Sequence, residues 1–190
     1  MAVDTGMTIT HRNLDGYGAP PIEWDRVKAV LDGELTQAPG SGGPERHTVW
    51  LATINPDGSP HVTAIGMSQD NGGWYFTSGP ATRKSRNLAH DPRCVFSVAT
   101  EPFDLVIEGV ARRVTSAGEL ASVADSFVRG GWPCEVAGDA LTAQYSAQSA
   151  GPAPWHVYRM EPSTVVALGT CEPFGATKFQ LGEAKFTTRP

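Results

Sequence analysis

Cysteine is scarce in this sequence of 190 residues, and its three cysteines, Cys94, Cys134 and Cys171, lie far apart. An odd number without any Cys-x-x-Cys pair supports neither a disulfide framework nor a zinc site. The five histidines also lack the spacing of metal ligands. We therefore expect no metal centre.

Long apolar runs are missing as well. No stretch reaches the roughly 18 consecutive apolar residues that a membrane span needs, and residues 1–20 are too polar for a secretion signal. The net charge is −5, and the cations cluster only locally, which argues against a nucleic-acid partner. These absences predict a cytoplasmic protein that binds a small anion, without a membrane or nucleic-acid partner.

Three catalytic signatures are also absent: the Gly-x-Ser-x-Gly elbow, the Walker motif and paired carboxylates. Their absence is typical of an enzyme whose chemistry resides in a bound cofactor. The sequence accordingly indicates no catalytic residue.

Short strands joined by turns dominate the pattern. We expect an arm at 1–20 that is flexible or lies across a partner subunit, one domain at 21–181 and a polar tail at 182–190. Apolar periodicity and turn residues predict strands at 47–54, 60–67, 74–78, 93–99, 104–114, 155–160 and 164–170. They also predict helices at 22–35, 82–90, 117–129 and 139–148, a loop at 36–46 and a bulge at Gly109. Six or seven such strands with inserted helices predict a mostly β, antiparallel barrel.

The most informative stretch is residues 74–88, in which an aromatic strand leads through a short turn into a helix. That helix opens with three cations, Arg83, Lys84 and Arg86. Cations are unfavourable in a first turn, where unpaired N–H groups already carry about half a positive charge. A bound anion would reverse that penalty, although a solvated helix face is the alternative. This stretch therefore predicts a site for a phosphorylated ligand.

The same stretch resembles the flavin-binding split β-barrel superfamily, which includes pyridoxamine 5′-phosphate oxidase and actinobacterial deazaflavin reductases. Residues 75–78 (Tyr-Phe-Thr-Ser) and 82–84 (Thr-Arg-Lys) are similar to the phosphate-binding pieces of the oxidase. Residues 84–88 (Lys-Ser-Arg-Asn-Leu) are similar to the Lys-x-Arg-Asn-Leu of the reductases. Lys84 belongs to both patterns.

The resemblance extends over about residues 45–180. Residues 57–65 look like the family's hairpin, whose backbone lies along the edge of the flavin ring, and residues 175–179 look like its final strand. The oxidase has Arg at the position of His61 and Lys at that of Gly66. Because neither is present, we expect an enzyme other than a pyridoxamine phosphate oxidase.

The resemblance implies a homodimeric split barrel with its cofactor site at the subunit interface and a small-molecule substrate. The favoured cofactor is the deazaflavin F420, with FMN as the alternative. F420 would pass hydride to an electron-poor double bond, whereas a non-catalytic carrier or sensor is a third hypothesis. The cofactor-binding residues implied are His61, Thr63, Ala64, Ile65, Thr77, Ser78, Thr82, Arg83, Lys84 and Arg86.

The tryptophans Trp74, Trp132 and Trp155 are expected to be core or interface residues. For Trp132 and Trp155, a place in the wall of a substrate pocket is the alternative.

Overall fold

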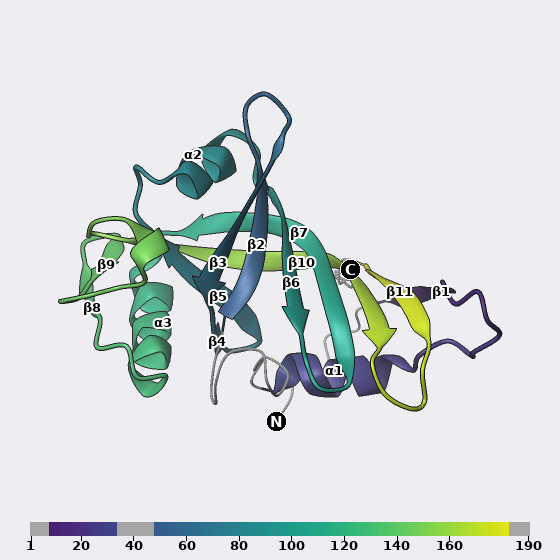
Figure 1. Ribbon diagram of the computed structural model, residues 1–190. Helices are drawn as coiled ribbons and strands as arrows, with labels where there is room; N and C mark the ends of the chain where they lie inside the picture. The colour runs from purple at the N-terminus through teal and green to yellow at the C-terminus, as the bar shows by residue number, and fades with distance from the viewer. Residues whose placement is uncertain (1–7, 34–47, 183–190) are drawn as a thin grey trace, which may run out of the picture.

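Antiparallel pairing organises the part of the chain that the computed structural model describes, residues 8–33 and 48–182. Nine strands form one sheet with the order β1-β11-β10-β7-β6-β2-β3, and β5 joins it by pairing with β10 and with β4 (Figure 1). These strands are β1 (Ile9–Asn13), β2 (Thr48–Ile54), β3 (Pro60–Gly66), β4 (Ser68–Asp70), β5 (Gly73–Ser78), β6 (Arg93–Ala99), β7 (Phe103–Val114), β10 (His156–Gly169) and β11 (Ala176–Leu181). The expectation of a mostly antiparallel β fold is confirmed.

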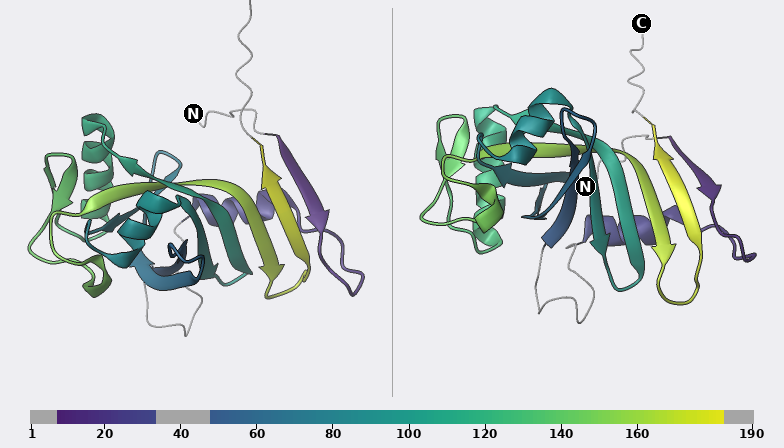
Figure 2. Two further views of the ribbon diagram at one scale, coloured as in Figure 1. Left: turned by 90° about the horizontal axis from the view of Figure 1, so that it is seen from above. Right: turned by 45° about the horizontal axis from the view of Figure 1, so that its top comes forward.

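Few helices accompany the sheet. They are α1 (Trp24–Asp32), α2 (Arg83–His90), α3 (Ala117–Arg129) and the 3₁₀ turn η1 (Gln148–Ala150). The hairpin of β8 (Glu135–Ala137) and β9 (Ala140–Thr142) forms a separate two-stranded sheet. Figures 1 and 2 show α3 and this hairpin at one end of the large sheet and β1 with β11 at the other. No helix in the described part of the chain has the length and apolar character that a membrane crossing requires.

The longest strand, β10, joins two segments that the sequence predicted as separate strands. It pairs with β5 and β7 in its first half and with β7 and β11 in its second half. A register shift between Pro162 and Thr164 lets the strand continue past a residue that lacks an N–H. The irregularity predicted at Gly109 on β7 therefore lies on β10, where Pro162 is paired with Gly109. A Cβ on Gly109 would lie 2.1 Å from the carbonyl oxygen of Glu161, so the close approach of the two strands requires glycine there.

Two hydrophobic cores lie on opposite sides of β5. Phe76 packs into the larger core, enclosed by the main sheet and α1, and its ring stacks 5.2 Å from that of Tyr158. Tyr75 points the other way into a smaller core beneath α3, which includes Leu120 and Phe127. Because both faces of β5 are buried, its C-terminal end and the following turn are held in a fixed place.

The structure corrects two sequence predictions. Residues 9–13, expected in a flexible arm, pair with β11, because an edge strand can form its ladder from backbone groups while its side chains stay polar. The helix expected at 139–148 is wrong: Gly138, with φ of 65°, turns the β8–β9 hairpin, and η1 begins only at Gln148. Because two predicted segments merge in β10, six of the strands expected from periodicity are present, and β1, β4 and β11 bring the sheet to nine. The predicted loop 36–46, residues 1–7 of the arm and residues 183–190 of the tail lie outside the described residues.

Candidate functional site

The turn between β5 and α2 is shaped by hydroxyl groups. Thr82 is the N-cap of α2, and its Oγ1 accepts a hydrogen bond of 3.3 Å from the backbone N–H of Ser85. Ser78, which is fully buried, places its Oγ 2.7 Å from Thr82 Oγ1. Both hydroxyls therefore have partners within the turn, and their predicted contact with a ligand stays a prediction.

Helix α2 is fixed to the sheet by the residues that follow its cations. The Nδ2 group of Asn87 donates to Thr53 Oγ1 and to Asn55 Oδ1, each at 3.0 Å. The next residue, Leu88, is buried in the larger core. These contacts fasten α2 to β2 and to the β2–β3 turn, so the cations at its start are held against the end of the sheet.

Lys84 is buried, with 2% of its surface exposed. Its Nζ donates to the backbone carbonyl of Ser149, and the described residues provide no carboxylate that pairs with it. Burial lowers the pKa of Lys84 from its ordinary value. An ammonium group has three donors, so this one carries an uncompensated positive charge and further capacity to bind an oxygen ligand. The alternative interpretation, that these cations form a solvated helix face, is therefore wrong for Lys84.

The neighbouring cations are exposed, and the positive charge at the start of α2 affects a histidine on β3. Arg83 and Arg86 lie on the solvent side of α2. His61, half-buried on β3, has its pKa lowered by burial first and then by the positive charges of Arg83 and Lys84. The structure thus brings His61 together with these cations in one electropositive region.

The segment around η1 connects this region to β3 and β5. Ser149 Oγ donates to the carbonyl of Ala64 at 3.1 Å, and Gly79 N–H donates to the carbonyl of Ala150 at 2.6 Å. Ile65, the next residue of β3, is buried, while Thr63 is half-buried. The chain near η1 therefore lies against the strand that was expected to contact a flavin ring.

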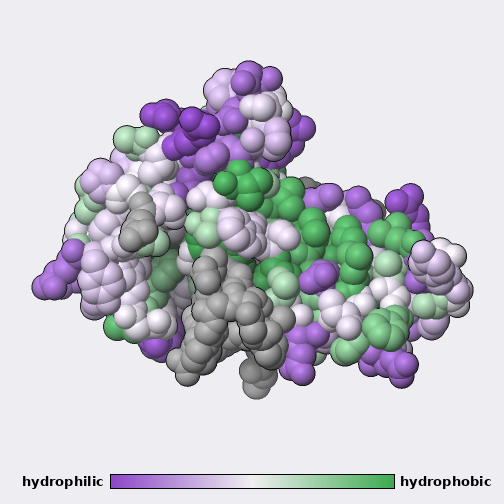
Figure 3. Space-filling view, in the orientation of Figure 1, coloured by the Kyte–Doolittle hydropathy of each residue, from purple (hydrophilic) through white to green (hydrophobic). Residues whose placement is uncertain are grey.

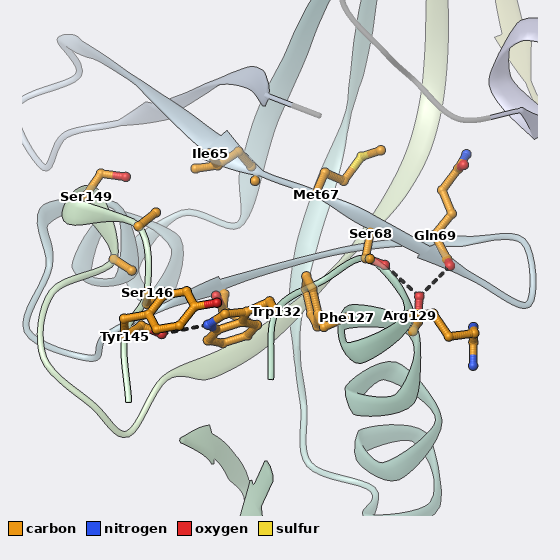
Figure 4. A pocket seen from close by; sticks show the side chains of 16 residues that line it. Ile65, Met67, Ser68, Gln69, Phe127, Arg129, Trp132, Tyr145, Ser146 and Ser149 are labelled. Atoms are coloured by element: carbon orange, nitrogen blue, oxygen red, sulfur yellow. Dashed lines mark hydrogen bonds between the residues drawn. The ribbon is translucent and has the colours of Figure 1, made fainter. Parts of the chain in front are cut away.

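A pocket of about 760 Å³ is lined in part by this segment (Figure 4). It is formed by the end of β3, by β4, by the C-terminal end of α3 and by residues 145–150. Of the predicted site residues, Ile65 and Thr77 line it. The others do not line it: His61, Thr63, Ala64, Ser78, Thr82, Arg83, Lys84 and Arg86. Lys84 nevertheless contacts its wall through the carbonyl of Ser149.

Several lining residues were not found by sequence reasoning, among them Met67, Phe127 and Arg129. Phe127 was predicted only as part of the apolar face of a helix, and nothing in that periodicity distinguishes a pocket from a core. Trp132 lines this pocket, whereas Trp155 is buried and does not line it. That the pocket takes a substrate stays a prediction.

Comparison with known proteins places this geometry in a family. Among curated proteins, none matches the sequence. A heme-binding protein from Mycobacterium smegmatis is 16% identical, with a TM-score of 0.51 over 70% of this chain. The chain spans 52% of that protein's length. A conserved hypothetical protein from Mycobacterium tuberculosis is 21% identical, with a TM-score of 0.52 over 80% of this chain and 86% of that chain.

An F420 reductase is 22% identical, with a TM-score of 0.40 over 64% of this chain and 90% of that chain, too low a likeness to bear on the cofactor. The family model described as pyridoxamine 5′-phosphate oxidase matches residues 42–169, well over half of the sequence. The chain therefore belongs to the pyridoxamine 5′-phosphate oxidase family.

Proposed function

We propose that the protein is an oxidoreductase that binds a phosphate-bearing flavin or deazaflavin, with F420 as its cofactor. The observation that carries this proposal is the buried ammonium of Lys84 at the start of α2, without an acidic partner among the described residues, in a member of this family. His61 and Gly66 differ from the residues expected of a pyridoxamine phosphate oxidase, so we do not propose that activity.

The residues at the start of α2 fit the phosphate of such a cofactor. Lys84 supplies a desolvated cation, Arg83 supplies a second cation on the solvent side, and the helix N-terminus favours an anion. The β3 backbone at Thr63, Ala64 and Ile65 would orient the ring. The bound cofactor would supply hydride transfer to an electron-poor double bond of a small organic substrate. The protein's own residues would bind, orient and exclude water.

The arrangement of the cations favours F420 over FMN. Arg83 and Arg86 are exposed on α2, beyond the buried Lys84. The oligoglutamyl tail of F420 carries carboxylates beyond its phosphate, whereas FMN ends at that group. Exposed cations next to a buried one would therefore serve the longer, more acidic cofactor.

A second proposal concerns the outer face of the sheet, which we infer is covered by a second copy of the chain. On β2 and β3, Val49, Leu51 and Ile65 face the core, yet the outward Trp50 and Val62 are also apolar and are 49% and 55% exposed. The register continues this outward face through further apolar residues: Ala52, Ala64, Val95, Val106 and Val166. Figure 3 shows apolar side chains gathered across this region.

A face of this kind, on which Ser97 and Glu108 share the register with mostly apolar residues, is typical of an interface between subunits. Val62 lies on β3 between the predicted cofactor contacts His61 and Thr63, so a partner seated there would border the cofactor site. This relationship supports a homodimeric split barrel with the site at the subunit interface.

The test is an absorption titration of the purified protein with F420 and, separately, with FMN. We expect saturable binding of F420 that is tighter than that of FMN, and oxidation of the bound reduced cofactor by an electron-poor enone. Tighter FMN binding would assign the site to the other cofactor, and binding without turnover would favour a carrier. Binding of neither cofactor would overturn the proposal.

A further inference from the structure

One part of the pocket has an aromatic wall. Phe127 and Trp132 meet edge to face, with ring centroids 5.3 Å apart and an interplanar angle of 89°. Figure 4 shows Tyr145 beside Trp132, and it shows Ile65 on β3 and Met67, just after that strand, across the pocket from them. Two apolar walls that face each other across a gap suit a flat ring, which can contact both of them.

The interior of this pocket is uncharged. Among its lining residues as the structure describes them, Arg129 is the one charged side chain. Figure 4 shows its guanidinium directed away from Trp132, and it lies 3.7 Å from Asp70. A charged ligand would therefore lose its hydration without gaining a partner, at a large cost in free energy.

Three hydroxyls of the wall, those of Ser68, Ser126 and Ser149, have hydrogen-bond partners within the protein. Ser68 Oγ lies 2.6 Å from Ser126 Oγ, which in turn donates to the carbonyl of Gln69 at 2.8 Å. Ser149 Oγ donates to the carbonyl of Ala64. Because these groups already have partners, they make little demand for a strongly polar ligand.

Trp132 is held in place before any ligand arrives. Its Nε1–H donates to the carbonyl of Tyr145 at 2.6 Å, and its ring lies against Phe127 and against Trp155, 5.6 Å away. Trp155 is itself fixed by a 2.8 Å hydrogen bond from its Nε1–H to the carbonyl of Gly151. A preorganised ring binds a flat partner with little further loss of conformational entropy.

From these observations we propose that the pocket binds a planar, uncharged ring compound stacked against Trp132, and that Trp132 determines which rings are accepted. The inference rests on the proposed function in one respect, since it takes this compound as the hydride acceptor. Ile65 and Thr77, which line the pocket and belong to the predicted cofactor site, would place the two ligands next to each other. The binding claim itself needs no cofactor.

The test compares two probes with nearly the same rings and different charge, N-phenyl-1-naphthylamine and 1-anilinonaphthalene-8-sulfonate. Fluorescence titration of the full chain without cofactor should show saturable binding of the neutral probe, about tenfold or more tighter than that of the sulfonate. Equal or tighter binding of the sulfonate, or no saturable binding of the neutral probe, would overturn the proposal.

Trp132→Ala should weaken binding of the neutral probe by about tenfold or more, because it removes the stacking surface. Tyr17→Ala, which alters a fully exposed tyrosine outside the pocket, is the matched control and should leave binding unchanged. If Trp132→Ala does not fold, Tyr145→Ala serves instead, because Tyr145 is 58% exposed and its side chain carries little packing. Unchanged affinity in both pocket variants would contradict the role of this wall.

The outcomes separate this inference from the proposed function. Binding of F420 or FMN without binding of the neutral probe would support the proposed cofactor site and contradict the proposed use of the pocket. Binding of the neutral probe through Trp132 without binding of either cofactor would support the proposed use of the pocket and contradict the proposed oxidoreductase function.

Discussion

The ammonium of Lys84 donates to the backbone carbonyl of Ser149, and this contact joins the start of α2 to the wall of the pocket. Each residue has a second attachment. Lys84 belongs to the helix that Asn87 fastens to β2, and Ser149 bonds through its hydroxyl to Ala64 on β3. An anion at Lys84 and a ligand in the pocket would thus meet at one residue, Ser149, although they occupy different places.

Replacing Lys84 separates its role in binding from any role in folding. Lys84→Met should weaken cofactor binding by about 1.5–3 kcal/mol, roughly 10- to 150-fold, because it removes a charge-assisted hydrogen bond. The melting temperature of the cofactor-free protein should not fall, since the variant also removes a buried charge without an acidic partner. Absorption titration and thermal unfolding measure the two effects.

The control for this experiment is Lys28→Met on α1, where the lysine is exposed and pairs with Asp32 one turn later. It should leave cofactor binding unchanged. An unchanged dissociation constant in Lys84→Met would remove this residue from the site. A large loss of stability there would instead show a structural role.

The lowered pKa of Lys84 has consequences of opposite sign for binding and for stability. Anion binding needs the ammonium form, so affinity should decline as pH rises through a value below the 10.5 of an ordinary lysine. The unfolded chain keeps this proton up to the ordinary lysine pKa. The folded protein releases it at a lower pH and then no longer buries an unpaired charge. Between the two pKa values, the stability of the cofactor-free protein relative to Lys84→Met should therefore rise with pH. Titrations and denaturant unfolding at several pH values measure both trends, and parallel trends would contradict this assignment.

His61 reports on the same electropositive region. Burial, together with the charges of Arg83 and Lys84, lowers its pKa below 6.5, so it should be neutral at pH 7. Arg83→Gln should raise this pKa toward the ordinary value, and saturation with inorganic phosphate should raise it as well. Histidine ring signals followed by NMR over pH 5–8 give the midpoint. Arg12→Gln, on the exposed side of β1, is the control. A His61 midpoint that shifts in Arg12→Gln and not in Arg83→Gln would show that the positive charge acting on His61 lies elsewhere.

Local signals in the sequence were enough to predict the elements that form the start of the site. A run of three aromatic residues predicts β5, and Thr82 caps the helix at the position where a hydroxyl is favoured. The same local reasoning places a helix at 117–129, which matches α3. Capping and periodicity depend on residues a few positions apart, so a single sequence contains them.

The contacts that complete the site are not local. Ser149 lies 65 residues from Lys84, in a segment of small polar residues without periodicity, and nothing in its composition indicates what it covers. The burial of Lys84 follows from that contact, so the sequence could predict the cation but not its environment. The pocket is missed for the same reason, because Phe127 becomes a wall residue only when α3 packs beside β4.

The outer face of β2 and β3 predicts the oligomeric state. Val62→Glu places a carboxylate in the proposed interface, where an unpaired charge would be desolvated, and should convert a dimer into a monomer. Val136→Glu is the matched control, because Val136 on β8 is 44% exposed and lies off this face. Sedimentation velocity of both variants and of the parent protein gives the masses. A monomeric parent protein, or a dimer that persists in Val62→Glu, would contradict the proposed interface.

The close approach of η1 to the end of β5 depends on the absence of a side chain at Gly79. A Cβ on this residue would lie 2.7 Å from the carbonyl oxygen of Ala150 and 2.9 Å from that of Pro152, and both are backbone atoms that cannot rotate away. Gly79→Ala should therefore displace the segment that carries Ser149 and lower the free energy of unfolding by about 1–3 kcal/mol. It should also weaken binding of the neutral naphthylamine probe, because the displaced segment is a wall of the pocket.

The matched control for Gly79→Ala is Gly118→Ala in α3, where an added Cβ meets no atom within 4 Å. Alanine is the better helix former, so this variant should gain up to about 1 kcal/mol and bind the probe as the parent protein does. Denaturant unfolding and probe titration of both variants measure these effects. Equal stability and equal probe affinity in Gly79→Ala and the parent protein would mean that residues 145–150 can shift without affecting the pocket. In that case, the contact between Lys84 and Ser149 would not position the wall.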